Sequence, residues 1–204
     1  MWILPNVLSQ DNLILLKIYI IMRIGLFILL AFSTIQAPES NFIEVSMRSP
    51  DLTSCWEDAP SIRVCDGINI PRSRIEKAVR FWKKIGYSFG PIFYDNKSAA
   101  CISDGLTGEI RIGLPEQGFD FNNLAVTKTT KFRENNLIIY SQIDIQENKV
   151  LLERVLEHEI GHALGWQHTG RSNHIMNRLW ERGGVQSYGV EHSVYKKRCS
   201  LIAE

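Results

Sequence analysis

Apolar residues recur with helical spacing in one segment of the chain. They occupy positions i, i+3, i+4 and i+7: Ile75, Ala78, Val79 and Trp82. This spacing places them on one face of an α-helix. Pro71 precedes the pattern and Gly86 follows it, and these residue types are typical of the first turn and of the end of a helix. The sequence therefore predicts a helix between Pro71 and Gly86.

Short extended segments surround this helix and are separated by turn signals. These segments are residues 61–65, 91–94, 109–114, 124–131 and 137–145. A second helix is expected at about residues 149–164. The polar, glycine-rich chain after Trp180 has no clear pattern. The order of strand, helix, several strands and helix indicates an α/β or α+β sheet with two helices packed on it.

The N-terminal segment differs from the rest of the chain. Three residues interrupt an otherwise apolar run over residues 13–32: Lys17, Arg23 and Gly25. Counted from Met22, the segment has a basic start, an apolar run and the small residue Ala37, which is the layout of a secretory signal peptide. A membrane anchor is the alternative, although basic residues within an apolar span are costly.

Cleavage after Ala37 would divide the chain in two. Residues 1–37 would hold an N-terminal extension and the signal peptide, with the working start at Met22. Residues 38–204 would form a single domain, which we expect to be secreted, monomeric and without stable membrane association. If the apolar run were instead an anchor, the same domain would lie outside the cell.

Composition and charge narrow the class of protein. Of the 204 residues, 45% are hydrophobic and 22% are charged, which is typical of a folded domain and not of a disordered chain. Lys and Arg number 23 and Asp and Glu number 22, so the net charge is +1. Nucleic-acid-binding proteins are normally visibly basic, and we expect no nucleic-acid partner.

Four cysteines follow the apolar segment: Cys55, Cys65, Cys101 and Cys199. In an exported chain an even number suggests two disulfides, for which three connectivities exist. We favour the local pair Cys55–Cys65, which leaves Cys101–Cys199 to hold the C-terminus. Free buried thiols are the alternative. No Cys-x-x-Cys pair is present, so a thiolate zinc site is not expected.

The motif His-Glu-x-x-His-x-x-Gly-x-x-His is the clearest chemical pattern in the chain. Residues four apart share one face of a helix, so His158 and His162 can bind the same metal ion. Glu159 lies beside this site without being a ligand. Gly165 can adopt a left-handed conformation that ends the helix and returns His168 as a third ligand. Three nitrogens and an open fourth position are what a catalytic zinc requires.

The motif is followed after eight residues by Met176, within Asn-His-Ile-Met-Asn. The complete pattern resembles the metzincin clan of zinc endopeptidases with their Met-turn. The spacing from His168 to Met176 and the order of elements resemble the matrixin branch in particular. This resemblance implies an α+β, zincin-like fold. It would have a twisted mixed β-sheet, two long helices with the active-site helix at about 149–164, and a small irregular C-terminal subdomain.

The resemblance also implies a role for each motif residue. One zinc ion would be bound by three histidines: His158, His162 and His168. Glu159 would act as general base and acid while a zinc-activated water hydrolyses the peptide bond. Met176 would form an apolar floor beneath the ligands. Arg178 stands where astacins and serralysins use an additional tyrosine ligand, so we expect three protein ligands.

By the same resemblance, a protein or peptide substrate would lie extended along the edge strand at residues 124–131. The stretch 177–188 would wall the pocket just past the scissile bond. Trp180 and Tyr188 are candidates for that wall, or else are ordinary core aromatics.

Two alternatives remain open. Glu181 lies 19 residues after His162 and could be the third ligand of a thermolysin-like zinc peptidase, but this hypothesis leaves Gly165 and His168 unexplained. The chain could also be a catalytically silent, zinc-containing secreted binding protein. The intact Glu159 argues against this second hypothesis, because a binding protein has no need of the base.

Overall fold

A computed structural model of the chain describes residues 49–65, 69–95, 101, 107–115 and 119–202. All of these belong to one unit, Phe42–Glu204. The predicted signal peptide and its cleavage after Ala37 lie outside the described residues. Within the described part, none of the helices has the length and apolar character needed to cross a membrane.

Among the described residues, five strands form one mixed β-sheet. They are β1 (Ser61–Cys65), β2 (Ile92–Asp95), β3 (Glu109–Gly113), β4 (Ala125–Lys131) and β5 (Ile138–Ile145). Their order is β2-β1-β3-β5-β4, with parallel pairing throughout except between β4 and β5. Each predicted strand agrees with the structure to within one residue at either end. The predicted mixed sheet is confirmed, and β4 is one of its two edges.

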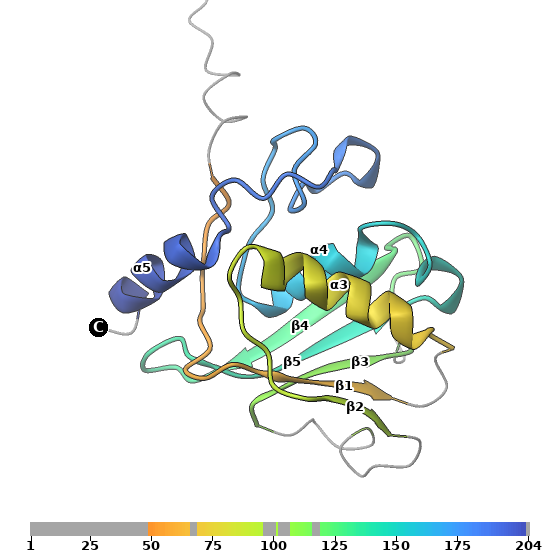
Figure 1. Cartoon of the computed structure of the whole chain (residues 1–204), viewed down its shortest axis with the longest axis horizontal. Coiled ribbons are helices and arrows are strands. Elements are labelled where there is room, and N and C mark those ends of the chain that lie inside the picture. The colour runs from red at the N-terminus through yellow and green to blue at the C-terminus, as the bar shows by residue number, and fades with distance from the viewer. Residues whose placement is uncertain (1–48, 66–68, 96–100, 102–106, 116–118, 203–204) are drawn as a thin grey trace, which may run out of the picture. The chain divides into compact units, whose positions relative to one another are not determined.

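Helices α3 (Arg72–Lys84) and α4 (Val155–Ala163) lie on the same face of the sheet (Figure 1). The apolar face predicted for α3 is buried, with Ile75, Ala78 and Trp82 fully inaccessible to solvent. Burial of a large apolar side chain contributes about 1.5–3 kcal/mol to stability. The indole Nε1 of Trp82 also donates a hydrogen bond to the backbone oxygen of Glu157, at 2.8 Å. The core between the helices and the sheet therefore holds α4 in place.

The helix predicted at about residues 149–164 is shorter in the structure. Residues Glu147–Lys149 form a separate 3₁₀ turn, and α4 begins only at Val155. Arg154, directly before it, has a left-handed backbone with φ 71°. A right-handed helix cannot continue through such a residue, so the expected start at about residue 149 is wrong.

A further helix, α5 (His192–Ile202), lies in the C-terminal part to which the sequence assigned no element. Tyr195 is its one buried residue, so the helix has no wide apolar stripe for a sequence pattern to reveal. The Tyr195 hydroxyl accepts a hydrogen bond from the backbone N–H of Trp56 at 2.7 Å. This contact ties α5 to the start of the described chain.

The disulfides differ from the favoured pairing. The structure joins Cys55 to Cys199 and Cys65 to Cys101, so the prediction of Cys55–Cys65 and Cys101–Cys199 is wrong. Strand β1 is extended and carries Cys65 roughly 13 Å along its own length, away from the segment of Cys55. Helix α5 instead brings Cys199 to a Cα–Cα distance of 5.8 Å from Cys55.

Removal of Cys55–Cys199 by the double change Cys55→Ser/Cys199→Ser should lower the melting temperature more than Cys65→Ser/Cys101→Ser. The two bridges span 144 and 36 residues. Loop-closure entropy predicts contributions of about 5 and about 4 kcal/mol respectively. Calorimetry on both double variants measures this difference, and peptide mapping of the unreduced protein checks the pairing. Recovery of a peptide joining Cys55 to Cys65 would contradict the structure.

Candidate active site

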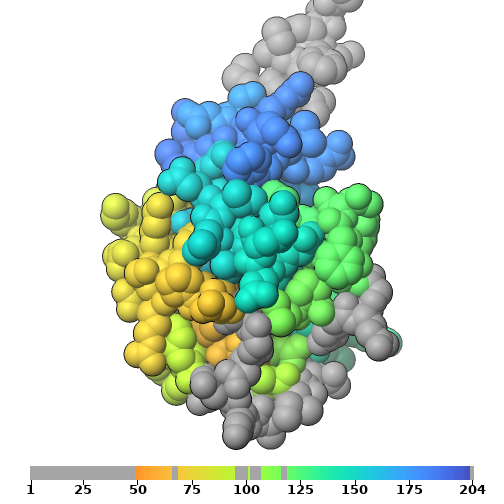
Figure 2. Space-filling model, turned by 90° about the vertical axis from the view of Figure 1, so that its right-hand side faces the viewer, coloured from red at the N-terminus to blue at the C-terminus, as the bar shows by residue number. Residues whose placement is uncertain are grey.

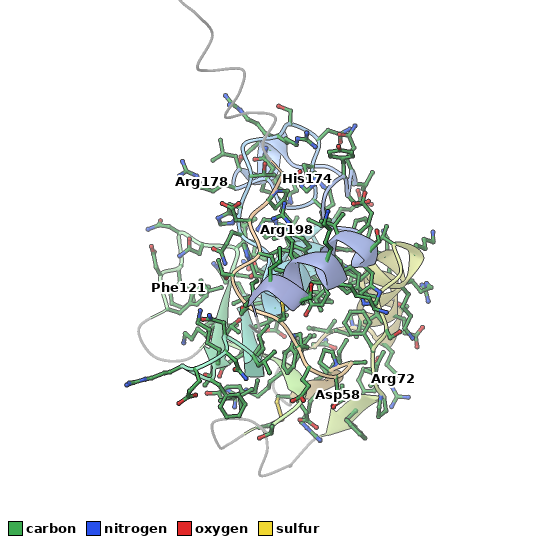
Figure 3. All side chains as sticks on the ribbon, turned by 90° about the vertical axis from the view of Figure 1, so that its left-hand side faces the viewer. Asp58, Arg72, Phe121, His174, Arg178 and Arg198 are labelled. Atoms are coloured by element: carbon green, nitrogen blue, oxygen red, sulfur yellow. A yellow bond between two sulfur atoms is a disulfide. The ribbon has the colours of Figure 1, made fainter. Side chains whose placement is uncertain are left out.

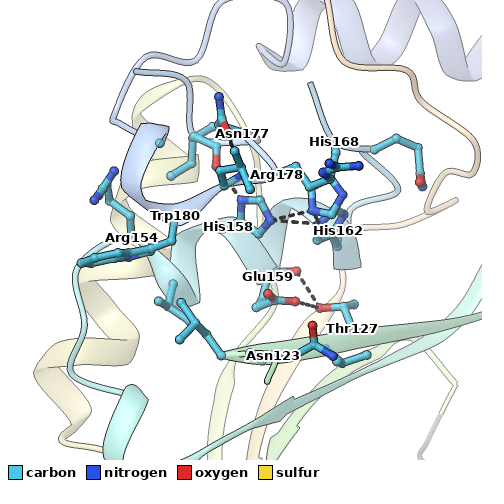
Figure 4. A pocket seen from close by; sticks show the side chains of 18 of the residues that line it. Asn123, Thr127, Arg154, His158, Glu159, His162, His168, Asn177, Arg178 and Trp180 are labelled. Atoms are coloured by element: carbon cyan, nitrogen blue, oxygen red, sulfur yellow. Dashed lines mark hydrogen bonds between the residues drawn. The ribbon is translucent and has the colours of Figure 1, made fainter. Parts of the chain in front are cut away.

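Helix α4 and the turn after it bring three imidazoles together (Figure 4). The Nε2 atoms of His158 and His162, one helical turn apart, are 3.0 Å from each other. The Nε2 atom of His168 lies 3.0 Å from that of His162 and 3.2 Å from that of His158. Among the described residues, these three form a group of side chains able to hold a metal ion, and Glu181 is not part of it.

Gly165 makes the return of the chain possible. Its φ is +97°, and a Cβ at this position would overlap the backbone oxygen of Ser54. A residue with a side chain would therefore meet both backbone strain and a collision. The chain turns at Gly165 between the end of α4 and His168.

The geometry of the three nitrogens fits a zinc ion. Zinc lies about 2.0–2.1 Å from histidine nitrogens in tetrahedral sites, which places two such nitrogens about 3.3 Å apart. The three Nε2 distances of 3.0–3.2 Å are close to this value. Three nitrogen donors also suit zinc chemically and leave a fourth position open.

Backbone carbonyls set the tautomer of both helix histidines. The Nδ1 atom of His158 lies 2.7 Å from the oxygen of Ile175, and that of His162 lies 2.7 Å from the oxygen of Trp166. A carbonyl only accepts, so each Nδ1 must donate its N–H. The lone pair of each ring is then on Nε2, where the three rings converge.

The surroundings keep these histidines uncharged. Burial lowers the pKa of His158 to about 4 and that of His162 to about 3. Partial burial and the charge of Arg178 lower the pKa of His168 as well. Neutral imidazole is the form that binds metal, so the site is in its metal-binding state at neutral pH.

Glu159 lies beside the three histidines and points toward β4. Its side chain is buried, and the hydroxyl Oγ1 of Thr127 donates a hydrogen bond to its Oε2 at 2.6 Å (Figure 4). Desolvation raises the pKa of Glu159 to about 7, while the hydrogen bond from Thr127 acts in the opposite direction. The sequence motif revealed Glu159 but not Thr127, which no local pattern connects to it.

Met176 packs against Gly161 of α4. It is fully buried, and a Cβ at Gly161 would collide with its sulfur and come within 2.8 Å of the Trp82 ring. The absence of a side chain at Gly161 therefore permits this close packing. The carbonyl of Ile175 that accepts the hydrogen bond from His158 belongs to the same turn, so the turn helps to orient His158.

A cleft of about 870 Å³ runs past the histidines. Residues 122–127, at the start of β4, line one side, and residues 177–181 line the other. Arg178, which lines the cleft, lies toward the same side of the molecule as Phe121 in Figure 3. In Figure 2 the β4 region (green) and the segment near residue 150 (teal) lie below the C-terminal part (blue).

The two aromatic candidates for the pocket wall differ in their positions. Trp180 lines the cleft, where its Nε1 donates to the oxygen of Glu153 and the guanidinium of Arg154 lies 5.2 Å from its ring centre. Tyr188 is 65% exposed and is not among the described residues that line the cleft. Arg154 also lines the cleft, and the sequence analysis did not single it out.

Comparison with known proteins identifies the family. The matrixin family model matches residues 72–193, more than half of the chain and the part that contains α3, the sheet from β2 onward and the complete histidine motif. The chain belongs to the matrixin family. The resemblance inferred from the motif is thereby confirmed, together with the zincin-like α+β fold expected of a matrixin.

One solved structure similar to this matrixin is metalloproteinase-II from Bacteroides fragilis. The two are 12% identical in sequence with a TM-score of 0.46, over 74% of this chain. The chain spans 57% of the length of that protein. No curated protein matches this matrixin significantly in sequence.

Proposed function

We propose that this matrixin is a secreted zinc-dependent endopeptidase that hydrolyses peptide bonds within extended protein or peptide substrates. The convergence of three neutral Nε2 atoms beside a buried carboxylate, at the base of an open cleft, supports this function most directly. Membership of the matrixin family supports it independently. We further propose that a single zinc ion is held by His158, His162 and His168.

A zinc ion at this site would supply a Lewis acid for the carbonyl oxygen and lower the pKa of a water molecule. The Glu159 carboxylate removes a proton from the attacking water. At the same time the oxygen of this water forms a bond to the peptide carbonyl carbon. Glu159 then gives this proton to the amide nitrogen as the C–N bond breaks. The products are a carboxylic acid and an amine, and Glu159 is again a carboxylate.

Strand β4 provides the surface against which the substrate would lie. Within the part of the chain that the structure describes, it pairs with β5 alone, which leaves the backbone groups of its other edge open toward the cleft. An extended peptide adds to such an edge through main-chain hydrogen bonds, while pockets for alternate side chains give selectivity. Trp180, on the opposite side of the cleft, would then bound a pocket beyond the scissile bond.

Two disulfides support the proposed location outside the cell. All four cysteines are paired, and disulfides persist in oxidising compartments, whereas cytosolic thiols are kept reduced. Sequencing the N-terminus of the protein recovered from a secreting host tests the proposed cleavage. A mature chain that begins at Pro38 would support it, and an intact N-terminus on a membrane-bound protein would favour the anchor.

Zinc dependence provides the direct test of the activity. The purified full chain should cleave members of a broad peptide library at internal bonds, lose this activity after removal of metal by a chelator, and regain it with stoichiometric zinc. Mass spectrometry of the products identifies the cleaved bonds, and atomic emission measures the metal. Failure of the folded, zinc-loaded protein to cleave any peptide would favour the silent binding protein.

A further inference from the structure

We propose that Thr127 is a positioning residue, whose hydroxyl holds the carboxylate of Glu159 in the orientation needed for proton transfer. This inference rests on the proposed function. It assigns to the edge strand a part in placing the base as well as in binding the substrate.

The contact between the two side chains is direct. The Oγ1 atom of Thr127 lies 2.6 Å from Oε2 of Glu159 and 3.2 Å from the backbone oxygen of the same residue. Its single hydroxyl proton is best placed on the carboxylate, since the shorter distance is typical of a bond to a charged oxygen. In the part of the chain that the structure describes, no other side chain hydrogen-bonds this carboxylate.

The fold leaves Thr127 little freedom to point elsewhere. Side chains alternate along β4, so Thr127 and Thr129 share the face directed at α4. Thr127 is held in register opposite Ile143 by the antiparallel pairing with β5. Thr129, one step further along this face, places its hydroxyl 3.1 Å from Oγ of Ser141 instead. The two threonines therefore have the same strand environment but different partners.

The bond has a consequence for how Glu159 can act. A buried carboxylate without a donor would be poorly satisfied and free to change rotamer. With Oε2 bound to the hydroxyl, Oε1 is the oxygen left to take the proton from water and return it to the leaving nitrogen. Thr127 also belongs to the strand against which the substrate would lie. Strand β4 would thus position both the carboxylate of Glu159, through Thr127, and the scissile bond of the substrate.

Three variants of the full-length, zinc-loaded enzyme test this role. Thr127→Val keeps the shape of the side chain and removes the hydroxyl, and it should lower kcat by about 10- to 100-fold, the loss typical of a misplaced catalytic group. KM and zinc content should stay within about twofold of wild type. Thr127→Ser restores a hydroxyl and should recover most of kcat. Ser141→Ala, which removes a buried hydroxyl from the neighbouring strand β5 outside the cleft, should lose far less.

Crystal structures provide a measure that does not depend on turnover. In Thr127→Val the Glu159 side chain should adopt a second rotamer, whereas wild type and Thr127→Ser should show one. A merely structural role would instead appear as a lower melting temperature, shared by Ser141→Ala, with Glu159 unmoved. If Thr127→Val folds poorly, the comparison of Thr127→Ser with Thr127→Ala takes its place.

The outcomes separate this inference from the proposed function. Wild type that cleaves no peptide contradicts the proposed function itself. Wild type that cleaves, together with Thr127→Val of equal kcat and an unmoved Glu159, overturns the positioning role alone. A Thr127→Ser variant as slow as Thr127→Val would also overturn it, because the hydroxyl would then not be the group that matters.

Discussion

Replacement of Glu159 by glutamine will remove most of the peptidase activity while zinc remains bound. Glutamine has nearly the same shape but cannot take a proton from water, and general acid–base groups typically contribute about 10²- to 10⁴-fold to the rate. The expected loss in kcat/KM is in this range. The three Nε2 atoms do not depend on the carboxylate, so metal content should match that of wild type.

Glu147→Gln is the matched control for this prediction. Glu147 is exposed in the 3₁₀ turn before α4, and the same chemical change there should leave both activity and zinc unaltered. Peptide hydrolysis followed by fluorescence gives the rates, and atomic emission gives the metal content. A Glu159→Gln variant that turns over as fast as wild type would show that another group acts as the base.

The second large effect concerns the third ligand. His168→Ala should weaken zinc binding by at least about 100-fold, since it removes one of three protein nitrogens from a tetrahedral site. Glu181→Ala should bind zinc as wild type does, because Glu181 is an exposed residue of the 3₁₀ turn Trp180–Arg182 and lies outside the histidine group. Competition with a chromogenic chelator measures both affinities.

The reverse pattern would support the thermolysin-like hypothesis. If Glu181→Ala released zinc and His168→Ala kept it, the segment after Met176 would have to close over the metal. Circular dichroism and melting temperature of each variant separate loss of a ligand from loss of the fold.

Local patterns predicted much of the scaffold. All five strands and α3 are found where alternation, turn signals and helical spacing placed them. Such patterns work here because each element buries one face, and the faces of α3 and of the central strands are largely fully buried. Where burial is slight, as in α5 with Tyr195 as its one buried residue, the pattern is weak and the helix was not predicted.

The start of α4 was predicted wrongly for a different reason. Residues 150–154 have helix-forming composition, yet the chain forms a turn there and Arg154 adopts φ 71°. Its guanidinium lies over the ring of Trp180, which is distant in sequence. The left-handed backbone of Arg154 thus occurs together with a tertiary contact, and helix propensity alone does not predict it.

The sequence by itself determined the candidate metal ligands and the turn that unites them. This was possible because His158 and His162 are one helical turn apart, and Gly165 lies three residues after His162 and three before His168. Only the tertiary structure decided the disulfide pairing and the contact of Thr127 with Glu159. The disulfide partners are up to 144 residues apart, and Thr127 and Glu159 are 32 residues apart. These contacts depend on how the edge strand, α4 and α5 pack together, which no local spacing encodes.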